Sequence, residues 1–403
     1  MAGQGTPPDA ARANPRDPIP GAPTGSPTGP AADSIPDRAE AIDAAWLEAA
    51  LRERHPGVRV ESVEVADRAE VTNNHAWLRV RLAEPAGVPE SLFCKLLPVE
   101  PARRAAIAAT GMGLREARFY AELAPLLKLR VPRAFVARSD AGDGRFVLLL
   151  EDLRLAGCTV SSGPESVPPD AAADALADLA DLHVRYEDPG RRAREAGFVK
   201  PPDPPSDYGS TRLAFALARR RDGFGEAFAE ASRLYVDHQP ALHALWAAGP
   251  STVIHGDTHI GNLFFDPAGA AAPESARVAS AAVGRVGFLD WGMLVVSTPL
   301  RDVAYFLQMA LSVEDRRREE RRLLDHYLAV RRALGGSGID RDEAFRAYRI
   351  QAAYLAPASC QVVTLPDDAT PARRRFAAAF LQRAEAAIED LEACRAVHEA
   401  AGI

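Results

Sequence analysis

The chain has 403 residues, a formal net charge of -7 at pH 7 and 26% charged residues, which allows one large or two moderate domains and gives no basic footprint for a nucleic-acid partner. Its four cysteines are widely spaced without a Cys-x-x-Cys pair, so we expect reduced thiols and neither a disulfide framework nor a zinc site. No apolar run approaches the roughly 18 residues of a membrane span, and the first residues lack a signal-peptide pattern, so the sequence predicts a cytoplasmic protein without a membrane partner.

The first segment, residues 1–37, is rich in Pro, Gly, Ala, Ser and Thr and has almost no large apolar side chain. Such a segment cannot bury enough surface to offset the entropy of ordering, so we predict a disordered tail. Apolar residues near helical spacing between Arg38 and Arg54 then predict an amphipathic helix, which Pro56 and Gly57 end.

Three short apolar or alternating stretches follow, at residues 58–65, 76–82 and 91–97. Neighbouring strands with short connections predict an antiparallel sheet. The turn between the first two strands contains no glycine. Asn73 and Asn74 nevertheless tolerate the left-handed backbone that a tight turn needs.

Two charged side chains lie among apolar neighbours in this part of the chain. Lys95 is inside the third strand, and Glu116 is near the start of a helical segment at residues 114–123. Taken alone, a lysine in a strand indicates only a sheet edge that is protected against aggregation.

The second half of the chain is mainly helical in pattern. A buried strand at residues 146–153 ends in two acids, and a helix is predicted at 170–186. Residues 187–210 are rich in proline and predict a loop. Helical segments follow at 212–233 and 240–247.

The most informative stretch is residues 253–265, in which a polar octet separates two apolar runs. This pattern predicts a strand, a loop and a strand, with the reactive side chains on the loop. The octet carries His255, Asp257, His259 and Asn262.

A further buried strand ends on Asp290, and the residues between, 266–284, predict a long hairpin connection. Two carboxylates and an amide at strand ends are what a divalent cation and a phosphoryl-transfer reaction need. Asp257 would orient an attacking hydroxyl and accept its proton. Asn262 and Asp290 would hold Mg²⁺ through hard oxygen ligands.

A family resemblance rests on two motifs, His255-Gly256-Asp257-x-His259-x-Gly261-Asn262 and Asp290-Trp291-Gly292. They resemble the catalytic loop and the metal-binding strand of the aminoglycoside phosphotransferase and choline kinase superfamily, small-molecule relatives of the protein kinases. The layout is most similar to the ecdysteroid-kinase-like phosphotransferases, which often have Gln where this chain has Gly292. The resemblance covers the chain from about residue 39 to its C-terminal helices.

The resemblance implies a Mg²⁺-dependent kinase that transfers the γ-phosphate of ATP or GTP to a hydroxyl of a small molecule. In such an enzyme Lys95 would grip the α- and β-phosphates, and Glu116 would fix the lysine in place. The main chain from Glu151 to Leu153 would meet the adenine edge. The helical segments after residue 187 would form part of the wall around the acceptor. The sequence leaves open which molecule the acceptor is and whether it is an antibiotic.

Three more residues near the loop receive roles from the same resemblance. His255 would pack and hydrogen-bond behind the loop, and His259 would face the substrate. Asp302, near the start of a helix that begins at about Thr298, is either a favourable acid at a helix N-terminus or an acceptor of hydrogen bonds from the loop's backbone.

The order of elements predicts an α+β, bilobal, protein-kinase-like fold. After the tail, residues 38–152 would form a small N-lobe with an antiparallel sheet, and residues 153–403 would form a larger, mainly helical C-lobe. Nucleotide would lie in the cleft between the lobes. The oligomeric state stays open.

Two other functions remain alternatives to a kinase. His255, Asp257 and His259 also resemble an in-loop ligand set for zinc or a two-metal centre, as in a metallohydrolase, although further ligands at short spacing are missing. The chain could also be a non-catalytic nucleotide-binding relative. Its combination of Lys95 and Glu116 with the loop residues argues against that.

Overall fold

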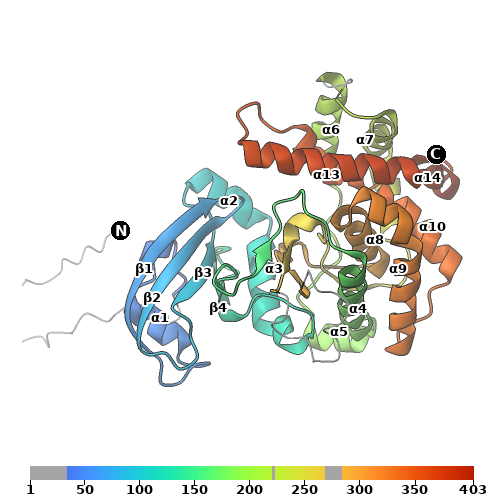
Figure 1. Ribbon diagram of the computed structural model, residues 1–403. Helices are drawn as coiled ribbons and strands as arrows, with labels where there is room; N and C mark the ends of the chain where they lie inside the picture. Colours follow the sequence, from blue (N-terminus) through green and yellow to red (C-terminus); the bar gives the residue numbers. More distant parts are fainter. Residues whose placement is uncertain (1–33, 220–222, 268–283) are drawn as a thin grey trace, which may run out of the picture.

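The computed structural model describes residues 34–219, 223–267 and 284–403 of the chain. In these ranges a sheet-bearing N-lobe lies beside a larger, mainly helical C-lobe (Figure 1). The expected α+β fold class with two unequal lobes is therefore confirmed, while the domain boundaries stay predictions. Among the described helices, none combines the length and the apolar character that crossing a bilayer requires.

The N-lobe is built on a five-stranded sheet in the order β1-β2-β3-β5-β4, in which every neighbouring pair is antiparallel. Side chains alternate across it: Ala76 and Leu78 are buried with helix α1, whereas His75 and Trp77 face the opposite side. The strands are β1 (Arg59–Glu70), β2 (Asn74–Glu84), β3 (Ser91–Leu96), β4 (Ala134–Ser139) and β5 (Phe146–Glu151).

The start of the folded part differs in two ways from the sequence pattern. The helix expected over residues 38–54 is a 3₁₀ turn, Ala39–Ala41, followed by α1, Ala44–Leu51, because Asp43 caps α1 by accepting a hydrogen bond from the Trp46 N–H at 2.7 Å. In addition, Ile35 is buried and the Ser34 carbonyl accepts a hydrogen bond from the Trp46 indole. Residues 34–37 thus pack on the N-lobe, and residues 1–33 of the predicted tail lie outside the described residues.

A short helical run connects strands β3 and β4 of this sheet. It comprises α2 (Pro101–Ala109), α3 (Met112–Arg118) and a π-helical turn, Phe119–Leu123, followed by a 3₁₀ turn, Ala124–Leu126. Helix α3 approaches β5 so closely that a Cβ on Gly113 would lie 2.1 Å from the ring of Phe146. Glycine at this position therefore allows α3, which carries Glu116, to lie directly on the sheet.

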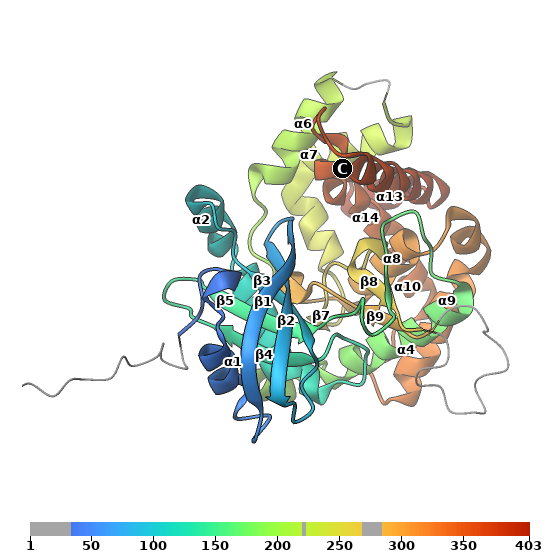
Figure 2. The same cartoon turned by 60° about the vertical axis from the view of Figure 1, so that its left-hand side comes forward.

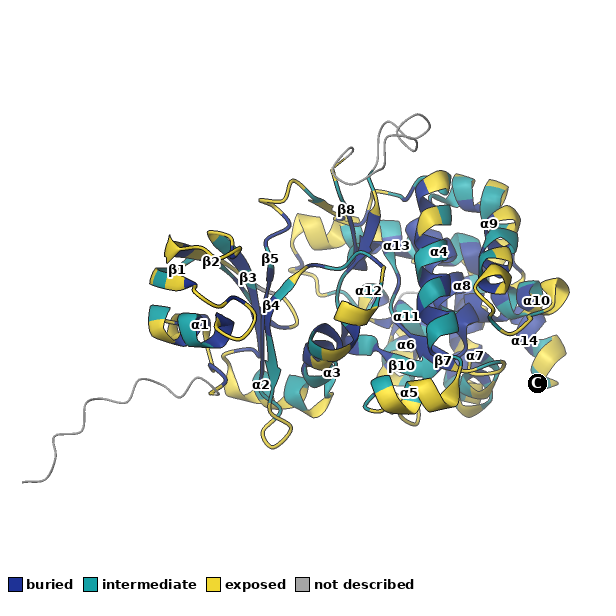
Figure 3. Ribbon diagram, turned by 90° about the horizontal axis from the view of Figure 1, so that it is seen from below, coloured by how far each residue is buried: buried dark blue, intermediate teal, exposed yellow. Residues whose placement is uncertain are grey.

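The C-lobe packs its helices around one large buried core, in which α4 lies against α9, α10 against α8, and α13 against α7 (Figures 1 and 3). Helix α13 runs across the end of the lobe beside α6 and α7 (Figure 2). The helices are α4 (Pro169–Arg185), α5 (Pro189–Glu195), α6 (Asp207–Arg219), α7 (Glu226–Trp246), α8 (Pro299–Ala310), α9 (Val313–Ala333), α10 (Arg341–Ala352), α11 (Leu355–Ala358), α12 (Cys360–Val363), α13 (Pro371–Asp390) and α14 (Ala393–Ala401).

Two helical predictions for this lobe were wrong. Residues 187–210 contain helix α5, which Asp188 caps by accepting from the Arg191 N–H at 2.7 Å. The single helix expected over residues 212–233 is divided, because α6 ends at Arg219 and α7 begins at Glu226. The helix expected from Pro240 follows a kink within α7 at His238, which has a non-helical backbone. The predicted hairpin connection at 266–284 lies mostly outside the described residues.

Two small sheets frame the polar octet of residues 255–262. Strand β7 (Thr252–Ile254) leads into it and pairs with β10 (Val295–Ser297). Strand β8 (Leu263–Phe265) leaves it and pairs with β6 (Thr159–Val160) on one side and β9 (Val286–Phe288) on the other. The octet is thereby held from both ends.

Candidate active site

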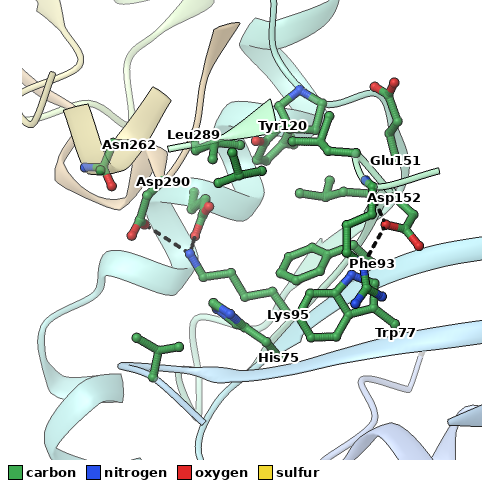
Figure 4. Close-up of a pocket in the computed structure, with 18 residues that line it drawn as sticks. His75, Trp77, Phe93, Lys95, Tyr120, Glu151, Asp152, Asn262, Leu289 and Asp290 are labelled. Atoms are coloured by element: carbon green, nitrogen blue, oxygen red, sulfur yellow. Dashed lines mark hydrogen bonds and ion pairs between the residues drawn. The ribbon is translucent and has the colours of Figure 1, made fainter. Parts of the chain in front are cut away.

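The strand lysine and the helix glutamate predicted from the sequence meet across the interior of the cleft. The Lys95 Nζ lies 2.6 Å from Glu116 Oε2 and 3.0 Å from Asp290 Oδ1 (Figure 4). Lys95 and Glu116 are almost fully buried, whereas the Asp290 side chain is 44% exposed. One ammonium therefore joins the sheet, helix α3 and the turn at the end of β9.

The electrostatics of this trio follow from sharing one cation between two carboxylates. Burial lowers the pKa of Lys95, but Asp290 and Glu116 outweigh it, so the pKa is raised and the ammonium keeps its proton. The pKa of Glu116 is raised to about 7. Burial raises it most, the Lys95 charge lowers it only in part, and the Asp290 charge raises it further. The pKa of Asp290 is lowered, since Lys95 outweighs the effect of its burial.

The octet places Asp257 and Asn262 in direct contact. The Asn262 Nδ2 donates to Asp257 Oδ2 at 2.8 Å and to the Asp257 carbonyl at 2.9 Å. The Asp257 side chain stays 30% exposed. The carboxylate is thus oriented by the amide while remaining partly exposed.

The two histidines of the octet are engaged differently. His255 accepts a hydrogen bond at Nδ1 from the Asp257 N–H at 3.2 Å, so its Nε2–H donates to the Leu289 carbonyl at 2.8 Å. His259 accepts at Nδ1 from the Gly261 N–H at 3.0 Å, which leaves Nε2 facing Asp257 Oδ2 at 3.6 Å. Both nitrogens of His255 are therefore used behind the loop, and His259 supports Asp257 from the side.

Asp302, in the first turn of α8, binds the backbone of the octet. Its Oδ2 accepts from the His255 N–H and its Oδ1 from the Gly256 N–H, both at 2.7 Å, and its carbonyl accepts from the Thr258 hydroxyl at 2.8 Å. His183 donates to the same carboxylate at 3.3 Å. Gly256 has φ +83°, and a Cβ there would lie 2.5 Å from the Met293 carbonyl, so glycine is required for this close approach.

The turn that carries Asp290 is locked to helix α3. Asp290 has a left-handed backbone, φ 57° and ψ 64°, which is unfavourable for a residue other than glycine and is held by surrounding contacts. The Arg115 Nε donates to the Gly292 carbonyl at 2.9 Å. Trp291 stacks on Phe119, with ring centroids 3.8 Å apart. The position of Asp290 therefore depends on the position of α3.

A cavity of about 340 Å³ between the lobes is lined by Lys95, Asn262 and Asp290, together with Glu116 (Figure 4). On the sheet side, His75 pairs with Lys95 and Trp77 with Phe93 across β2 and β3, so two aromatic rings extend the floor beyond the lysine. Sequence reasoning missed these aromatic residues. The signal was present in the alternation of the strands, because residues two apart share one face with Lys95.

The chain matches the phosphotransferase enzyme family over residues 80–337. It belongs to that family. Among solved structures, it is similar to the GDP complex of an aminoglycoside 2'-phosphotransferase-IIIa (14% identity, TM-score 0.46, covering 86% of this chain and 99% of that one). It is also similar to a macrolide 2'-phosphotransferase from Brachybacterium faecium (16%, 0.41, 83% and 98%) and to choline kinase from Streptococcus pneumoniae (14%, 0.44, 82% and 94%). No curated protein matches the sequence.

In this phosphotransferase the linker between the lobes leaves the Leu153 N–H free to bind a ligand. The Glu151 N–H donates to the Arg133 carbonyl at 2.8 Å, and the Glu151 carboxylate is paired with Arg130, which also binds Asp266 of the C-lobe. The Glu151 side chain is therefore structural. Among the described residues the Leu153 N–H has no hydrogen-bond partner, and Leu153 lines the cavity.

The turn over the cavity departs from a glycine-rich loop. The Val71 N–H donates to the Asn73 carbonyl at 3.1 Å, which closes a tight turn between β1 and β2. Val71 lines the cavity and is 57% exposed. Asn73 is buried and its Oδ1 has no partner among the described residues.

The donor set at the cleft fits Mg²⁺ better than zinc. Asn262 and Asp290 line the same cavity, and because the Asn262 Nδ2 is bound to Asp257, its amide oxygen is the atom available to a cation. Mg²⁺ is held in such sites by one or two protein oxygens together with substrate phosphates and water. In the described part of the chain, no group of three or more His, Cys, Asp or Glu side chains is arranged to hold a metal ion, as a zinc site requires.

Proposed function

We propose that this family member is a small-molecule kinase that transfers the γ-phosphate of ATP or GTP to a hydroxyl of its acceptor. The observation that carries the proposal is the meeting of Lys95, Asn262 and Asp290 on one cavity, with Asp257 bound directly to Asn262. Phosphoryl transfer asks mainly for positioning and charge stabilisation, and this arrangement supplies both.

Asp257 orients the acceptor hydroxyl and receives its proton as the oxygen bonds to the γ-phosphorus. The bond from that phosphorus to the bridging oxygen breaks, and the nucleoside diphosphate leaves. Asn262 holds the Asp257 carboxylate in place, and Asp302 stiffens the backbone that presents it. Little reorganisation is then needed at the moment of transfer.

Lys95 supplies positive charge to the α- and β-phosphates, with Glu116 as its positioning partner. Asn262 and Asp290 would hold Mg²⁺, which neutralises the phosphate oxygens when bound. The free Leu153 N–H would donate to the base, and the rings of Trp77 and Phe93 would pack beneath it. Each of these roles is compatible with the contacts that the residue makes in the structure.

The metallohydrolase alternative has less support because His255 has no free nitrogen and the described residues contain no three-ligand site. The non-catalytic alternative has less support because Asp257 remains accessible beside its amide partner. The metallohydrolase alternative also leaves the Lys95 and Glu116 pair without a role.

Calorimetric titration with ATP and with GTP, each with and without Mg²⁺, tests the proposal. We expect one or both nucleotides to bind, with affinity that rises on adding Mg²⁺ and with that rise lost in Asp290→Asn. Matched titrations of Arg322→Gln, an exposed arginine on α9 paired with Glu319, control for the loss of a charge. Binding without any Mg²⁺ dependence in the wild-type protein would contradict the assignment of Asn262 and Asp290.

A further inference from the structure

A second cavity, of about 470 Å³, lies on the C-lobe side of the catalytic octet. The residues after Asp290 form one wall, and helices α6, α7 and α11 form others. Its lining is largely apolar and aromatic, with polar groups at a few points, which is the composition of a small-molecule site. Representative lining residues are Phe198, Tyr208, Tyr235, Leu294 and Tyr354.

The cavity shares a wall with the strand that leads to Asp257. Met293, Leu294 and Val295 line it, and Val295 pairs with Ile254, three residues before Asp257. On the other side Tyr305 packs edge-on to Tyr354 with ring centroids 5.7 Å apart, and the Asp257 charge helps to raise the pKa of Tyr305 after the larger effect of burial. The cavity wall is therefore in contact with the segments that surround Asp257.

Arg301 is the polar feature of this cavity that the kinase machinery does not use. One guanidinium nitrogen donates to the Tyr354 hydroxyl at 2.9 Å, and the group lies 4.5 Å from the centre of the Tyr354 ring. Its Nε is buried without a partner, and no carboxylate of the described residues forms an ion pair with it. The adjacent Asp302 is occupied by the His255 and Gly256 amides.

The buried arginines of the C-lobe show which partners a guanidinium with buried nitrogens ordinarily has. Arg316 is paired with Glu320 and Asp390, and Arg331 is paired with Glu187. Arg383 donates to four backbone carbonyls. Arg301 has one hydroxyl, one ring and the charge of the adjacent Asp302, but no carboxylate of the described residues pairs with it directly.

The remaining charges of the cavity do not compensate Arg301. Lys200 and Arg115 are also in the lining, against a single carboxylate, Asp203, whose charge acts on Arg115. His243 lies near Arg301 and is kept neutral, since burial and then the Arg301 charge lower its pKa. The cavity therefore has an excess of positive charge.

We propose that the acceptor of this kinase carries a carboxylate, which binds Arg301 while a hydroxyl of the same molecule reaches Asp257. The role given to the hydroxyl of the acceptor rests on the proposed function, whereas the carboxylate site rests on the cavity and its charge. Arg301 then acts as a specificity-determining residue, with planar donors suited to a carboxylate. An acceptor with an ammonium group in the same place would meet a like charge.

Three probes with one ring and one hydroxyl test the charge preference without requiring the natural acceptor. They are 4-hydroxybenzoate, 4-hydroxybenzamide and 4-hydroxybenzylamine, which carry a negative, a neutral and a positive group at neutral pH. Their affinities are measured by calorimetry at up to about ten millimolar, with the wild-type protein saturated with nucleoside diphosphate and Mg²⁺. Arg301→Gln removes the charge, Arg301→Lys keeps it, and Arg322→Gln is a control for a charge removed from an exposed site.

We expect the benzoate to bind about tenfold or more tightly than the benzamide, since a hydrogen bond to a charged group is worth roughly a tenfold change in affinity or more. The benzylamine should bind more weakly than both. The preference should disappear in Arg301→Gln, persist in part in Arg301→Lys and be unchanged in Arg322→Gln.

An equal or better affinity for the neutral or positive probe, a preference that survives in Arg301→Gln, or no binding of the benzoate in this range would overturn the proposal. Nucleotide titration of the same samples separates this result from a failure of the kinase assignment. Loss of nucleotide binding would argue against the kinase, whereas normal nucleotide binding without a carboxylate preference would argue only against the Arg301 site.

Discussion

Trp291 stacks on Phe119 with ring centroids 3.8 Å apart and planes 6° from parallel, and both rings are fully buried. Phe119 directly follows helix α3, which carries Glu116, and Trp291 directly follows Asp290. The stack therefore joins the element that fixes Lys95 to the element proposed to hold Mg²⁺. A movement of α3 would therefore change the positions of Lys95 and Asp290 relative to each other.

Replacing Trp291 with Ala should lower both stability and turnover. Removing a buried aromatic side chain of this size costs about 3–5 kcal/mol of unfolding free energy, and the freed turn should reduce kcat because Asp290 is no longer held. Trp291→Phe keeps a ring against Phe119 and should retain more of both. Urea unfolding and steady-state kinetics of the two variants check this, and equal kcat values for folded Ala and Phe variants would contradict it.

Lys95→Met should weaken nucleotide binding by about tenfold or more, because it removes a charge-assisted contact to the phosphates. It also leaves Glu116 and Asp290 without their shared cation. Fluorescence titration with a labelled nucleotide measures the change. The exposed Arg52, paired only with Glu48 four residues earlier, offers Arg52→Gln as a control. Unchanged nucleotide affinity in Lys95→Met would remove the lysine from the phosphate site.

Asp302→Asn should reduce kcat while leaving nucleotide affinity close to wild type. The amide can accept through only one oxygen, so one of the two octet N–H groups at 2.7 Å loses its acceptor. Leaving a buried donor unsatisfied costs about 1–3 kcal/mol, and the octet would be less firmly held. Parallel measurements of kcat, nucleotide affinity and thermal unfolding check this. A variant with normal kcat and normal stability would show that the octet does not need this support.

His75 should make stability depend on pH below neutrality. Burial, followed by the nearby Lys95 charge, lowers the pKa of His75 from 6.5 to about 4. The unfolded chain therefore binds a proton at a pH where the folded chain does not, and stability is lost as pH falls from 6.5 through about 4. The largest loss from this group is about 3 kcal/mol.

Urea unfolding of wild type and His75→Gln between pH 7 and 4 isolates that contribution. As the pH falls, the unfolding free energy of the wild type should decrease more than that of His75→Gln. A difference that stays constant over this range would mean that His75 titrates in the folded protein as it does in the unfolded chain.

The residues that sequence reasoning placed best are those within a motif or on a regular repeat. Asp257 and Asn262 are five residues apart in one loop, and Lys95 lies on a strand whose alternation assigns its face, so local pattern predicts where these side chains lie. The helix boundaries that were wrong depended on single caps, such as Asp188 at the start of α5, within a proline-rich stretch.

Contacts between distant segments could not be predicted from local sequence patterns. Arg130 joins Glu151 to Asp266, and Arg301 meets Tyr354 across 53 residues of sequence. No spacing rule links such pairs, because their separation depends on how whole helices pack. That Arg301 forms no ion pair with the described residues can be recognised only from the positions of the surrounding carboxylates in the structure.

The most direct test of the kinase assignment is the acceptor-stimulated release of nucleoside diphosphate by the wild-type protein and by Asp257→Asn. A panel of hydroxyl-bearing metabolites and antibiotics, including hydroxy acids, is supplied with ATP or GTP and Mg²⁺. The account predicts that an acceptor stimulates release in the wild type and that Asp257→Asn loses most of this stimulation while still binding nucleotide. Stimulated release at a near-normal rate in Asp257→Asn would contradict it.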